Sequence, residues 1–500
     1  MKIVFFVSED KSLGVGYLSS YLKTHGHQVY LLFDPCQFAK SYIQHPRLAR
    51  YFSKEKYFFK NIEDIHPDLI GFSTLTSNYQ WALRLARIVK EKFNIPIIFG
   101  GVHPTLVPEE VIREDCVDMV CIGEAEESLL ELANNFNSKK TDIRNIYFKK
   151  EDHVIKNSLR PLEQDLDKYP FPDEELFYNV LPASYRLSSS VMTSRGCPFL
   201  CTYCANKSLT DIYKGQKYLR RRSVDNVLSE LKLRKEEYKT RHFVFMDDIF
   251  SSDINWLNEF VPRYKKEIGL SFNCLAHPQL TDTQAIRLLK EAGCVMIDFG
   301  LQSGSPRLRK EVFSRFESNE RMQEVSSACH RNKMRFAIDH IFNVPSETDK
   351  DNLVSAKFYN QIRPDIINCY SLIYFPKAEI LNIAKRQGLL QQEDIGLIEE
   401  GKANGLYATV SLGKKRSLSF YSQYALFFSI LPLLPKSLIN KILGSRIILN
   451  LLTKLPLILL PFVKILVDLK SGMGFIPLSV LKNEIFFIRQ HFQQGRGIRA

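Results

Sequence analysis

The 500-residue sequence predicts an α/β protein in three parts: a doubly wound, Rossmann-like N-terminal domain (1–135), a partial (β/α)6 barrel (186–390) and a helical C-terminal region (391–500). Short apolar runs alternate with helical stretches in each of the first two parts, as strands and helices do around parallel sheets. The alternation then gives way to long apolar stretches. A composition of 45% hydrophobic and 25% charged residues is typical of globular domains, and the length is too great for one of them.

Five strands are expected in the N-terminal domain, at residues 2–7, 28–33, 69–73, 95–99 and 119–122, with helices at 17–25 and 81–93. Ligands of doubly wound sheets bind at the carboxyl ends of the strands. The turns at 8–16, 73–77 and 100–105 are therefore candidate binding loops.

A connector is expected at 136–185, where Tyr169-Pro-Phe-Pro172 disfavours helix. Six strands are then expected, at 188–193, 242–246, 270–276, 295–300, 335–342 and 366–373. Six βα units with this spacing favour a barrel whose active site lies at the carboxyl ends of its strands.

The C-terminal region contains two apolar stretches, 417–435 and 447–469, both broken by prolines. The first carries no charge and is flanked by basic residues, whereas the second contains Lys454, Lys464 and Asp468. A spanning helix needs about 20 mostly apolar residues, which neither stretch supplies cleanly. Two interpretations stay open: helices packed on the barrel, and helices lying in a membrane interface with Lys and Arg near the headgroups.

The formal net charge of +13 suits nucleic acid, an anionic membrane or anionic substrates, and decides among none of them because the basic residues are dispersed. The apolar start, Met1–Val7, is too short for a signal peptide and is expected to be a strand. Seven of the ten Cys stand singly and are expected to be buried, with no disulfide framework. The reducing cytoplasm is the expected compartment, with peripheral contact at the inner membrane face as an option.

Three cysteines are clustered, in Thr193-Ser-Arg-Gly-Cys197-Pro-Phe-Leu-Cys201-Thr-Tyr-Cys204. Thiolates are the natural ligands of iron–sulfur clusters, and three of them leave one iron of a four-iron cubane open for another ligand. A zinc site and unligated core cysteines are the alternatives; zinc sites usually add a distant second Cys pair or His residues, and the sequence has no such second pair. Cys197, Cys201 and Cys204 are the candidate metal ligands and catalytic centre.

The Gly-Cys-x3-Cys-x-aromatic-Cys pattern after the first barrel strand resembles the radical S-adenosylmethionine (SAM) superfamily. The resemblance implies a [4Fe–4S] cluster whose open iron chelates SAM, and whose electron cleaves SAM to a 5′-deoxyadenosyl radical. It places the backbone of Tyr203 near the adenine. It also assigns Asp247 to the SAM amino group, Gln302 and Ser303 to the ribose, and the Pro345 loop to the same cofactor. The sequence departs from the family pattern where Gln302 replaces Glu, and where Asn343 and Ser346 replace glycines.

Three N-terminal segments resemble the cobalamin-binding domain that often precedes such barrels: Ser73-Thr-Leu75, Gly100-Gly101-Val-His103 and Gly123-Glu124-Ala-Glu126. The resemblance implies cobalamin-binding roles for Ser73, Leu75, Gly100, Gly101, His103 and Glu124. Lys11 stands where such domains often carry the His that ligates cobalt, and an ammonium has no lone pair. Cobalamin is therefore expected base-off and without a His ligand, with His103 lining a loop or tail pocket.

The family so identified, cobalamin-binding radical SAM enzymes, implies methylation of an unactivated carbon. A cyclase or rearrangement enzyme of lipid or pigment biosynthesis is the alternative. A tRNA methylthiotransferase fits less well, because Cys36, Cys116 and Cys121 show no second-cluster pattern. A non-enzymatic carrier or sensor would not need the SAM-facing segments. The expected partners are a small-molecule or lipid substrate and a flavodoxin- or ferredoxin-type electron donor; a membrane surface is an option and nucleic acid is not expected.

Overall fold

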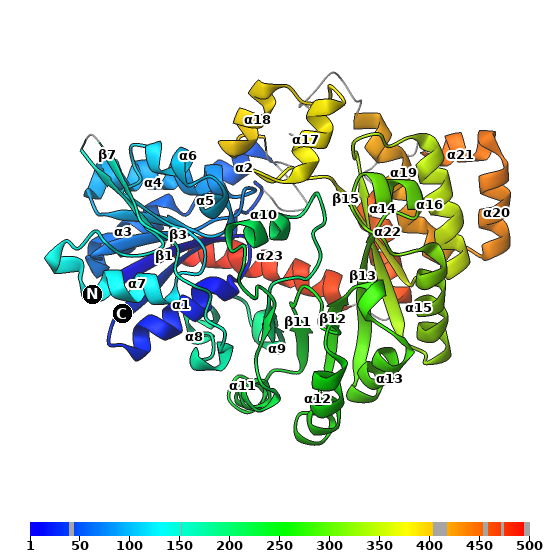
Figure 1. Cartoon of the computed structure of the whole chain (residues 1–500), viewed down its shortest axis with the longest axis horizontal. Coiled ribbons are helices and arrows are strands. Elements are labelled where there is room, and N and C mark those ends of the chain that lie inside the picture. The colour runs from blue at the N-terminus through cyan, green and yellow to red at the C-terminus, as the bar shows by residue number, and fades with distance from the viewer. Residues whose placement is uncertain (40–44, 152, 404–417, 454–458, 472–474, 495–500) are drawn as a thin grey trace.

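Two parallel sheets, each covered by helices, organise the chain (Figure 1). The computed structural model describes residues 1–39, 45–151, 153–403, 418–453, 459–471 and 475–494. The N-terminal sheet and the barrel sheet lie side by side, and the C-terminal helices pack on the barrel and reach across to the N-terminal domain (Figure 1). The predicted fold class is thus confirmed.

The N-terminal sheet has the order β2-β1-β3-β4-β5-β6-β7, parallel from β2 to β5. Its strands are β1 (Lys2–Ser8), β2 (Gln28–Asp34), β3 (Leu69–Ser73), β4 (Ile97–Gly100), β5 (Met119–Cys121), β6 (Ile146–Lys150) and β7 (His153–Lys156). Its helices are α1 (Leu13–Thr24), α2 (Pro46–Tyr51), α3 (Glu55–Ile65), α4 (Tyr79–Phe93), α5 (Val102–Leu106), α6 (Pro108–Arg113) and α7 (Glu126–Asn134). The order reverses between β1 and β3, which is where doubly wound sheets bind ligands.

The segment expected as a connector extends this sheet. β6 and β7 add to it as antiparallel strands, so the N-terminal unit continues past the boundary expected at residue 135. The two strands of this hairpin are short and rich in lysine, so their sequence pattern is also typical of a linker. Two short helices, α8 (Glu175–Tyr178) and α9 (Ser184–Leu187), lead into the barrel.

The barrel sheet is parallel throughout and has the order β15-β14-β13-β12-β11-β8. Its strands are β8 (Ser188–Val191), β11 (His242–Phe245), β12 (Ser271–Ala276), β13 (Cys294–Gln302), β14 (Arg335–Phe342) and β15 (Ile366–Ser371), with a small ribbon of β9 (Ser194–Arg195) and β10 (Arg220–Arg221). The helices are α10 (Ala205–Ile212), α11 (Val224–Glu236), α12 (Ile254–Glu267), α13 (Thr283–Ala292), α14 (Pro306–Glu311), α15 (Asn319–Arg331), α16 (Asp349–Ile362), α17 (Glu379–Arg386) and α18 (Gln392–Glu399). All six predicted strands are confirmed.

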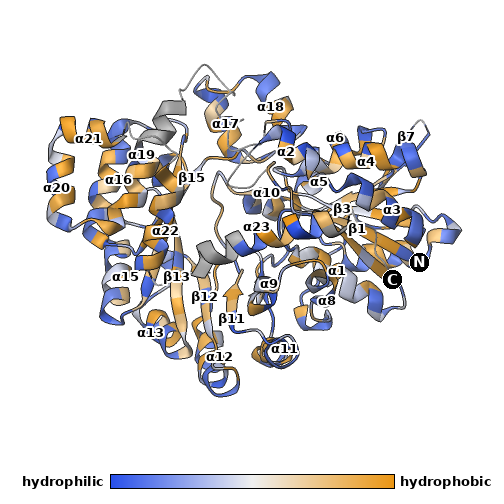
Figure 2. Ribbon diagram, turned by 180° about the vertical axis from the view of Figure 1, so that it is seen from behind, coloured by the Kyte–Doolittle hydropathy of each residue, from blue (hydrophilic) through white to orange (hydrophobic). Residues whose placement is uncertain are grey.

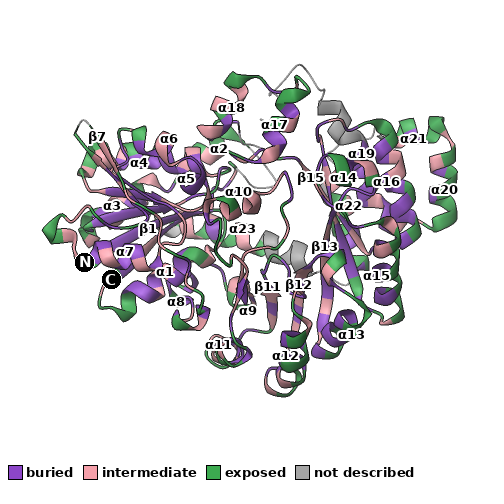
Figure 3. Cartoon of the chain, viewed as in Figure 1, coloured by how far each residue is buried: buried purple, intermediate pink, exposed green. Residues whose placement is uncertain are grey.

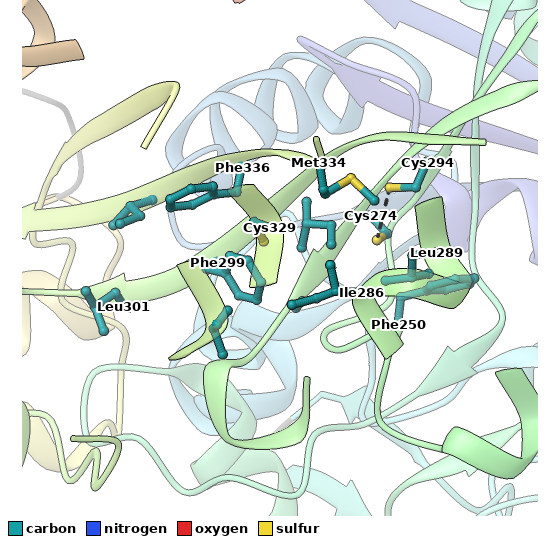
Figure 4. Close-up of a cluster of buried hydrophobic side chains, with 14 of the residues drawn as sticks. Phe250, Cys274, Ile286, Leu289, Cys294, Phe299, Leu301, Cys329, Met334 and Phe336 are labelled. Carbon is teal, nitrogen blue, oxygen red and sulfur yellow. Dashed lines mark hydrogen bonds between the residues drawn. The ribbon is translucent and has the colours of Figure 1, made fainter. Parts of the chain in front are cut away.

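The outer side of the barrel sheet packs on its helices through a continuous apolar layer (Figures 3 and 4). Several of the isolated cysteines lie in this layer. Cys274 and Cys294 are buried with their sulfurs 4.0 Å apart, too far for a disulfide, and Cys329 lies close to them (Figure 4). They act as small apolar residues, as predicted.

The C-terminal region is helical: α19 (Leu418–Ile430), α20 (Lys436–Gly444), α21 (Arg446–Thr453), α22 (Leu460–Lys470) and α23 (Phe475–Gln494). α19 is central, since it packs on β15, α21 and α22. α23 reaches the N-terminal domain, where Phe487 stacks on Phe33. Among the described residues, no helix is long and apolar enough to cross a bilayer.

Candidate active site

A buried carboxylate fixes the point at which the cysteine loop leaves the barrel. Asp247 follows β11 and is fully buried. It accepts hydrogen bonds from the backbone N–H of Thr193 at 3.1 Å, from its hydroxyl at 2.7 Å, and from the Ser194 hydroxyl. These bonds tie the exit of β8 to the neighbouring strand.

Gly196, directly before the first cysteine, has a structural reason to be glycine. Its φ is +93°, and a Cβ there would lie 2.5 Å from the carbonyl oxygen of Tyr218. The β9–β10 ribbon brings Tyr218 to this position. Only a residue without a side chain lets the loop turn so close to the ribbon.

The second half of the loop is pinned to two other elements. The Thr202 N–H donates to the Phe313 carbonyl at 3.1 Å, and its carbonyl accepts from the Ile380 N–H at 2.9 Å. Cys204 caps α10, with Sγ 3.5 Å from the Asn206 N–H. Cys201 is buried and the other two cysteines are half-buried, so three thiols share one anchored loop.

Burial raises the pKa of all three thiols, to about 12 for Cys197 and about 11 for Cys204. The negative charge of a neighbouring thiolate on the same loop also raises the pKa of Cys197 and of Cys204. Within the described ranges, no three His, Cys, Asp or Glu side chains converge closely enough to hold a metal ion as they stand. Three soft donors on one loop fit an iron–sulfur cluster chemically, and binding iron would convert them to thiolates and gather them.

Arg315 is the buried cation of this region, and no motif in the sequence pointed to it. Its Nη1 lies 3.7 Å from the Cys201 sulfur and 3.4 Å from the Tyr203 hydroxyl. Nε donates to Glu317 at 2.7 Å, and Nη2 donates to the Gly300 carbonyl. One guanidinium therefore links the cysteine loop to the end of β13.

The two adjacent carboxylates after β11, Asp247 and Asp248, have different surroundings. Asp247, expected at the SAM amino group, has its carboxylate committed to Thr193 and Ser194. Asp248 is exposed, accepts from the Asn206 amide at 3.1 Å, and influences the pKa of Cys197 and Cys204. Asp248 is thus the carboxylate beside the cysteines, and the sequence could not separate these adjacent residues.

The two further segments that were expected to face SAM follow β13 and β14, which are neighbours in the barrel sheet. Gln302 closes β13 with φ +68°, and Ser303 is buried and shares a 3.3 Å contact with Ser355. Pro345 lies buried in the loop after β14. Asn343 and Ser346, which replace the family's glycines, have φ of +63° and +62°. The loop therefore keeps the left-handed conformation that explains glycine at those positions.

Polar residues that sequence reasoning missed line the inner face of the barrel. A cavity of about 300 Å³ lies on this face. Its lining includes the polar residues Asn273, Asp298 and Asn368 and the apolar residues Met296 and Ile366. Asn368 donates to Asp298 at 3.1 Å and to Asp339 at 3.2 Å. Burial and the neighbouring Asp339 raise the pKa of Asp298 to about 8, so the carboxyl pair holds a proton near neutrality.

In the N-terminal domain, the loops after β3 and β4 are interlocked. Gly101 has φ +99°, and a Cβ there would lie 2.6 Å from the Thr74 carbonyl oxygen. Ser73 and Gly100 are half-buried and Leu75 is exposed, so small residues and one apolar side chain border this edge. These residues fit a broad ligand lying across the strand ends.

His103 lies beneath that edge. It is fully buried, with Nδ1 3.3 Å from the Thr76 hydroxyl and its ring 4.2 Å from that of Tyr79. Burial lowers its pKa to about 4, which keeps it neutral. Its role toward cobalamin, expected to be that of a loop or tail-pocket residue, stays a prediction.

Glu124 has a different setting from the one expected for a cofactor-binding residue. Its carboxylate pairs with Arg220 at 2.5 Å and with Arg195 at 3.4 Å, and Glu126 pairs with Arg195 at 2.6 Å. The Glu124 N–H donates to the Tyr213 hydroxyl. Both arginines belong to the β9–β10 ribbon beside the cysteine loop. The Gly-Glu-x-Glu segment therefore joins the two domains, and the cofactor role expected for Glu124 stays a prediction.

Lys11 also turns into this junction. Its ammonium pairs with Glu174, both side chains are buried, and Arg234 approaches the same Glu174 at 2.9 Å. Burial lowers the pKa of Lys11 to about 8. The residue at the usual histidine position thus belongs to a buried ion network.

The two halves of the site face each other. α10, which follows the cysteine loop, packs on α5, which follows β4. The helix after the cysteine loop therefore lies beside the helix that follows β4 of the N-terminal sheet. Ligands held at the two edges would be neighbours.

Comparison with known families defines the class of protein. Residues 7–133 match the family model of the B12 binding domain, and residues 191–358 match that of the radical SAM superfamily. The fold, the cysteine loop and these matches make the chain a radical SAM enzyme.

Named relatives narrow the class. An uncharacterized methyltransferase of Pyrococcus horikoshii is 28% identical over 66% of this chain and 72% of its own length. Cytidylyl-2-hydroxyethylphosphonate methyltransferase of Streptomyces wedmorensis is 28% identical over 63% of the chain and 65% of its own length. An anaerobic magnesium-protoporphyrin IX monomethyl ester cyclase of Cereibacter sphaeroides is 23% identical over 71% and 57%. The chain thus spans less than two thirds of the last two relatives.

Solved structures share the whole arrangement. The cobalamin-dependent SAM radical enzyme OxsB with aqua-cobalamin bound aligns with a TM-score of 0.64 and 16% identity, over 99% of this chain and 80% of that one. The radical SAM methyltransferase TsrM of Kitasatospora setae, with cobalamin and a [4Fe–4S] cluster bound, aligns at 0.62 and 16%, over 78% and 76%. The chain belongs to the radical SAM enzymes that carry a cobalamin-binding domain.

Proposed function

We propose that this enzyme methylates an unactivated carbon of a small or hydrophobic substrate. The observation that supports the proposal is the contact between α10 and α5. This contact places the cysteine loop of the barrel near the loops of the N-terminal sheet that are expected to bind cobalamin. When bound, the cluster with SAM supplies the radical that removes a hydrogen atom, and cobalamin supplies the methyl group. Cys197, Cys201 and Cys204 would hold the cluster.

The protein's own residues position the partners. Arg315 holds Cys201, Tyr203 and the end of β13 in one network, so the cysteine loop and the ribose-facing segment keep a fixed separation. Asp248, Gln302, Ser303 and the Pro345 loop are proposed to face SAM. Ser73, Leu75, Gly100 and Gly101 are proposed to border cobalamin, which is held base-off because Lys11 offers no lone pair.

The barrel cavity is proposed to receive part of the substrate. Among the described residues, the oxygens Asn273 Oδ1 and Asp298 Oδ1 have no hydrogen-bond partner other than the proton that the Asp298–Asp339 pair holds. Buried acceptors need donors. We propose that a substrate N–H or O–H group meets them while its apolar part rests on Met296 and Ile366.

The test is anaerobic purification with a reconstituted cluster and added cobalamin, followed by iron, sulfide and cobalt analysis. About four irons and one base-off cobalamin per chain, with label passing from methyl-labelled SAM to a product, support methyl transfer. A cyclase is the second candidate, because a cyclase is among the relatives. Cobalt-free protein that forms 5′-deoxyadenosine and transfers no label would contradict the methylase proposal.

The electron is proposed to come from a flavodoxin- or ferredoxin-type donor in the cytoplasm. The basic C-terminal helices are proposed to bring the enzyme to the inner membrane surface. The first proposal concerns the delivery of electrons and the second the delivery of substrate. Neither depends on whether the reaction is methylation or cyclisation.

A further inference from the structure

Helix α22 presents its apolar side to solvent. Phe462, Ile465, Leu466 and Leu469 are 64%, 40%, 56% and 59% exposed. Their spacing of three and four residues puts them on one face of the helix, in a stripe about 10 Å long. An exposed stripe of four large apolar side chains is unusual for a helix that has a core to pack on.

The opposite face of α22 meets the barrel. Lys464, Val467 and Asp468 line the barrel cavity, and Ser471, one turn further, is buried. These residues again follow the spacing of three and four. The helix is therefore amphipathic with most of its polar positions turned toward the barrel, the reverse of a surface helix of a globular protein.

The neighbouring helix α21 shows the same tendency. Ile447 and Leu451, four residues apart, are 75% and 66% exposed. α20 and α21 form an outer edge of the molecule that is largely exposed in Figure 3 and carries both hydrophobic and hydrophilic bands in Figure 2. Both α21 and α22 pack on α19, so each has its own support beneath the exposed apolar side chains.

The positive charge of the C-terminal helices indicates which kind of partner covers the exposed apolar side chains. Residues 418–494 contain eight Lys and Arg and only two Asp and Glu. Lys436, Lys441 and Arg446 are exposed on α20 and α21, and Arg446 directly precedes the exposed Ile447. On α22 itself, Lys464 lies on the side of the cavity and the Lys470 ammonium donates to the Pro432 carbonyl. A second copy of this surface would place like charges together, whereas anionic headgroups would attract them.

We propose that the outward face of α22 docks on an anionic lipid membrane. The four apolar side chains enter the headgroup–acyl boundary, and the exposed Lys436, Lys441 and Arg446 of α20 and α21 contact lipid phosphates. α22 then separates the bilayer from the barrel cavity by the thickness of one helix. The inference does not depend on which reaction the enzyme catalyses.

The test is flotation of the full chain with vesicles of phosphatidylcholine alone, or of phosphatidylcholine mixed equally with phosphatidylglycerol. Binding is expected to the mixed vesicles and to weaken with salt. The double substitution Ile465→Ser and Leu466→Ser should weaken it at least about tenfold, because two large apolar side chains leave the lipid. Leu397→Ser on α18 is the matched control, since Leu397 is 41% exposed, and it should bind as the parent does.

A second variant protects the test against loss of folding. Phe462→Trp keeps a large apolar side chain, and brominated lipids should quench the fluorescence of this variant more than that of the parent, which contains only Trp81 and Trp256. Equal quenching of the Phe462→Trp variant and the parent overturns the proposal, as does equal flotation of the double variant and the Leu397→Ser control. A dimer in sedimentation that the double variant dissociates, without vesicle binding, would also overturn it by identifying a second copy as the partner.

Discussion

Gly123 offers the sharpest test of the domain junction. Its φ is +71°, and a Cβ there would overlap the Tyr213 hydroxyl oxygen, which accepts the Glu124 N–H at 3.2 Å. Gly123→Ala therefore forces a side chain into the left-handed region and displaces a buried Tyr213. The first effect costs about 1–2 kcal/mol. The lost hydrogen bond and the off-rotamer ring add about 2 kcal/mol.

Gly388→Ala isolates the backbone part of this cost. Gly388 has φ +66°, and no atom lies within 4 Å of the position that a Cβ would take, so only the left-handed cost applies. We expect Gly123→Ala to destabilise the protein by about 2 kcal/mol more than Gly388→Ala, the share assigned to Tyr213. Urea unfolding measures both, with Trp81 reporting on the N-terminal domain and Trp256 on the barrel.

Tyr213→Phe completes a double-mutant cycle. It removes the oxygen that the new Cβ would meet, so Gly123→Ala with Tyr213→Phe should be less destabilising than the sum of the single changes by about 1 kcal/mol or more. Additive free energies, or equal costs for the two Gly→Ala changes, would refute the assignment of Gly123 to this contact. An additive result would mean that Tyr213 rotates away at no cost.

Three further outcomes are expected. Cys204→Ala should abolish iron retention and SAM cleavage in reconstituted protein, whereas Cys116→Ala, in the buried N-terminal core, should keep both; iron analysis decides. Lys11→His should leave cobalamin base-off, with no nitrogen splitting in the cob(II)alamin electron paramagnetic resonance spectrum, because position 11 faces Glu174. Asp298→Asn concerns stability: the raised pKa means that native Asp298 keeps a proton that the unfolded chain releases, so stability falls as pH rises from about 4 to about 8. The substitution should flatten that slope by about 1.4 kcal/mol per pH unit, and an unchanged slope would contradict the shared proton.

The sequence by itself determined the class of this protein. Three cysteines within eight residues indicate an iron–sulfur cluster before the fold is known, because the spacing of these ligands is a local property of the sequence. Strand and helix periodicity likewise located all six barrel strands, since each depends on neighbouring residues. The short β6–β7 hairpin was missed because its pattern is too brief to distinguish from a linker.

Tertiary structure decided which side chains face which partner. Asp247 and Asp248 are adjacent in sequence, yet one is buried against Thr193 and the other lies exposed beside the cysteines. Glu124, Lys11 and Arg315 gained their roles from residues 96 or more positions away. The outward stripe of α22 is likewise visible only once the barrel shows which side is occupied. The spacing of apolar residues in the sequence predicts that a helix has an apolar face and a polar face. Only packing against the rest of the protein decides which of the two faces is covered.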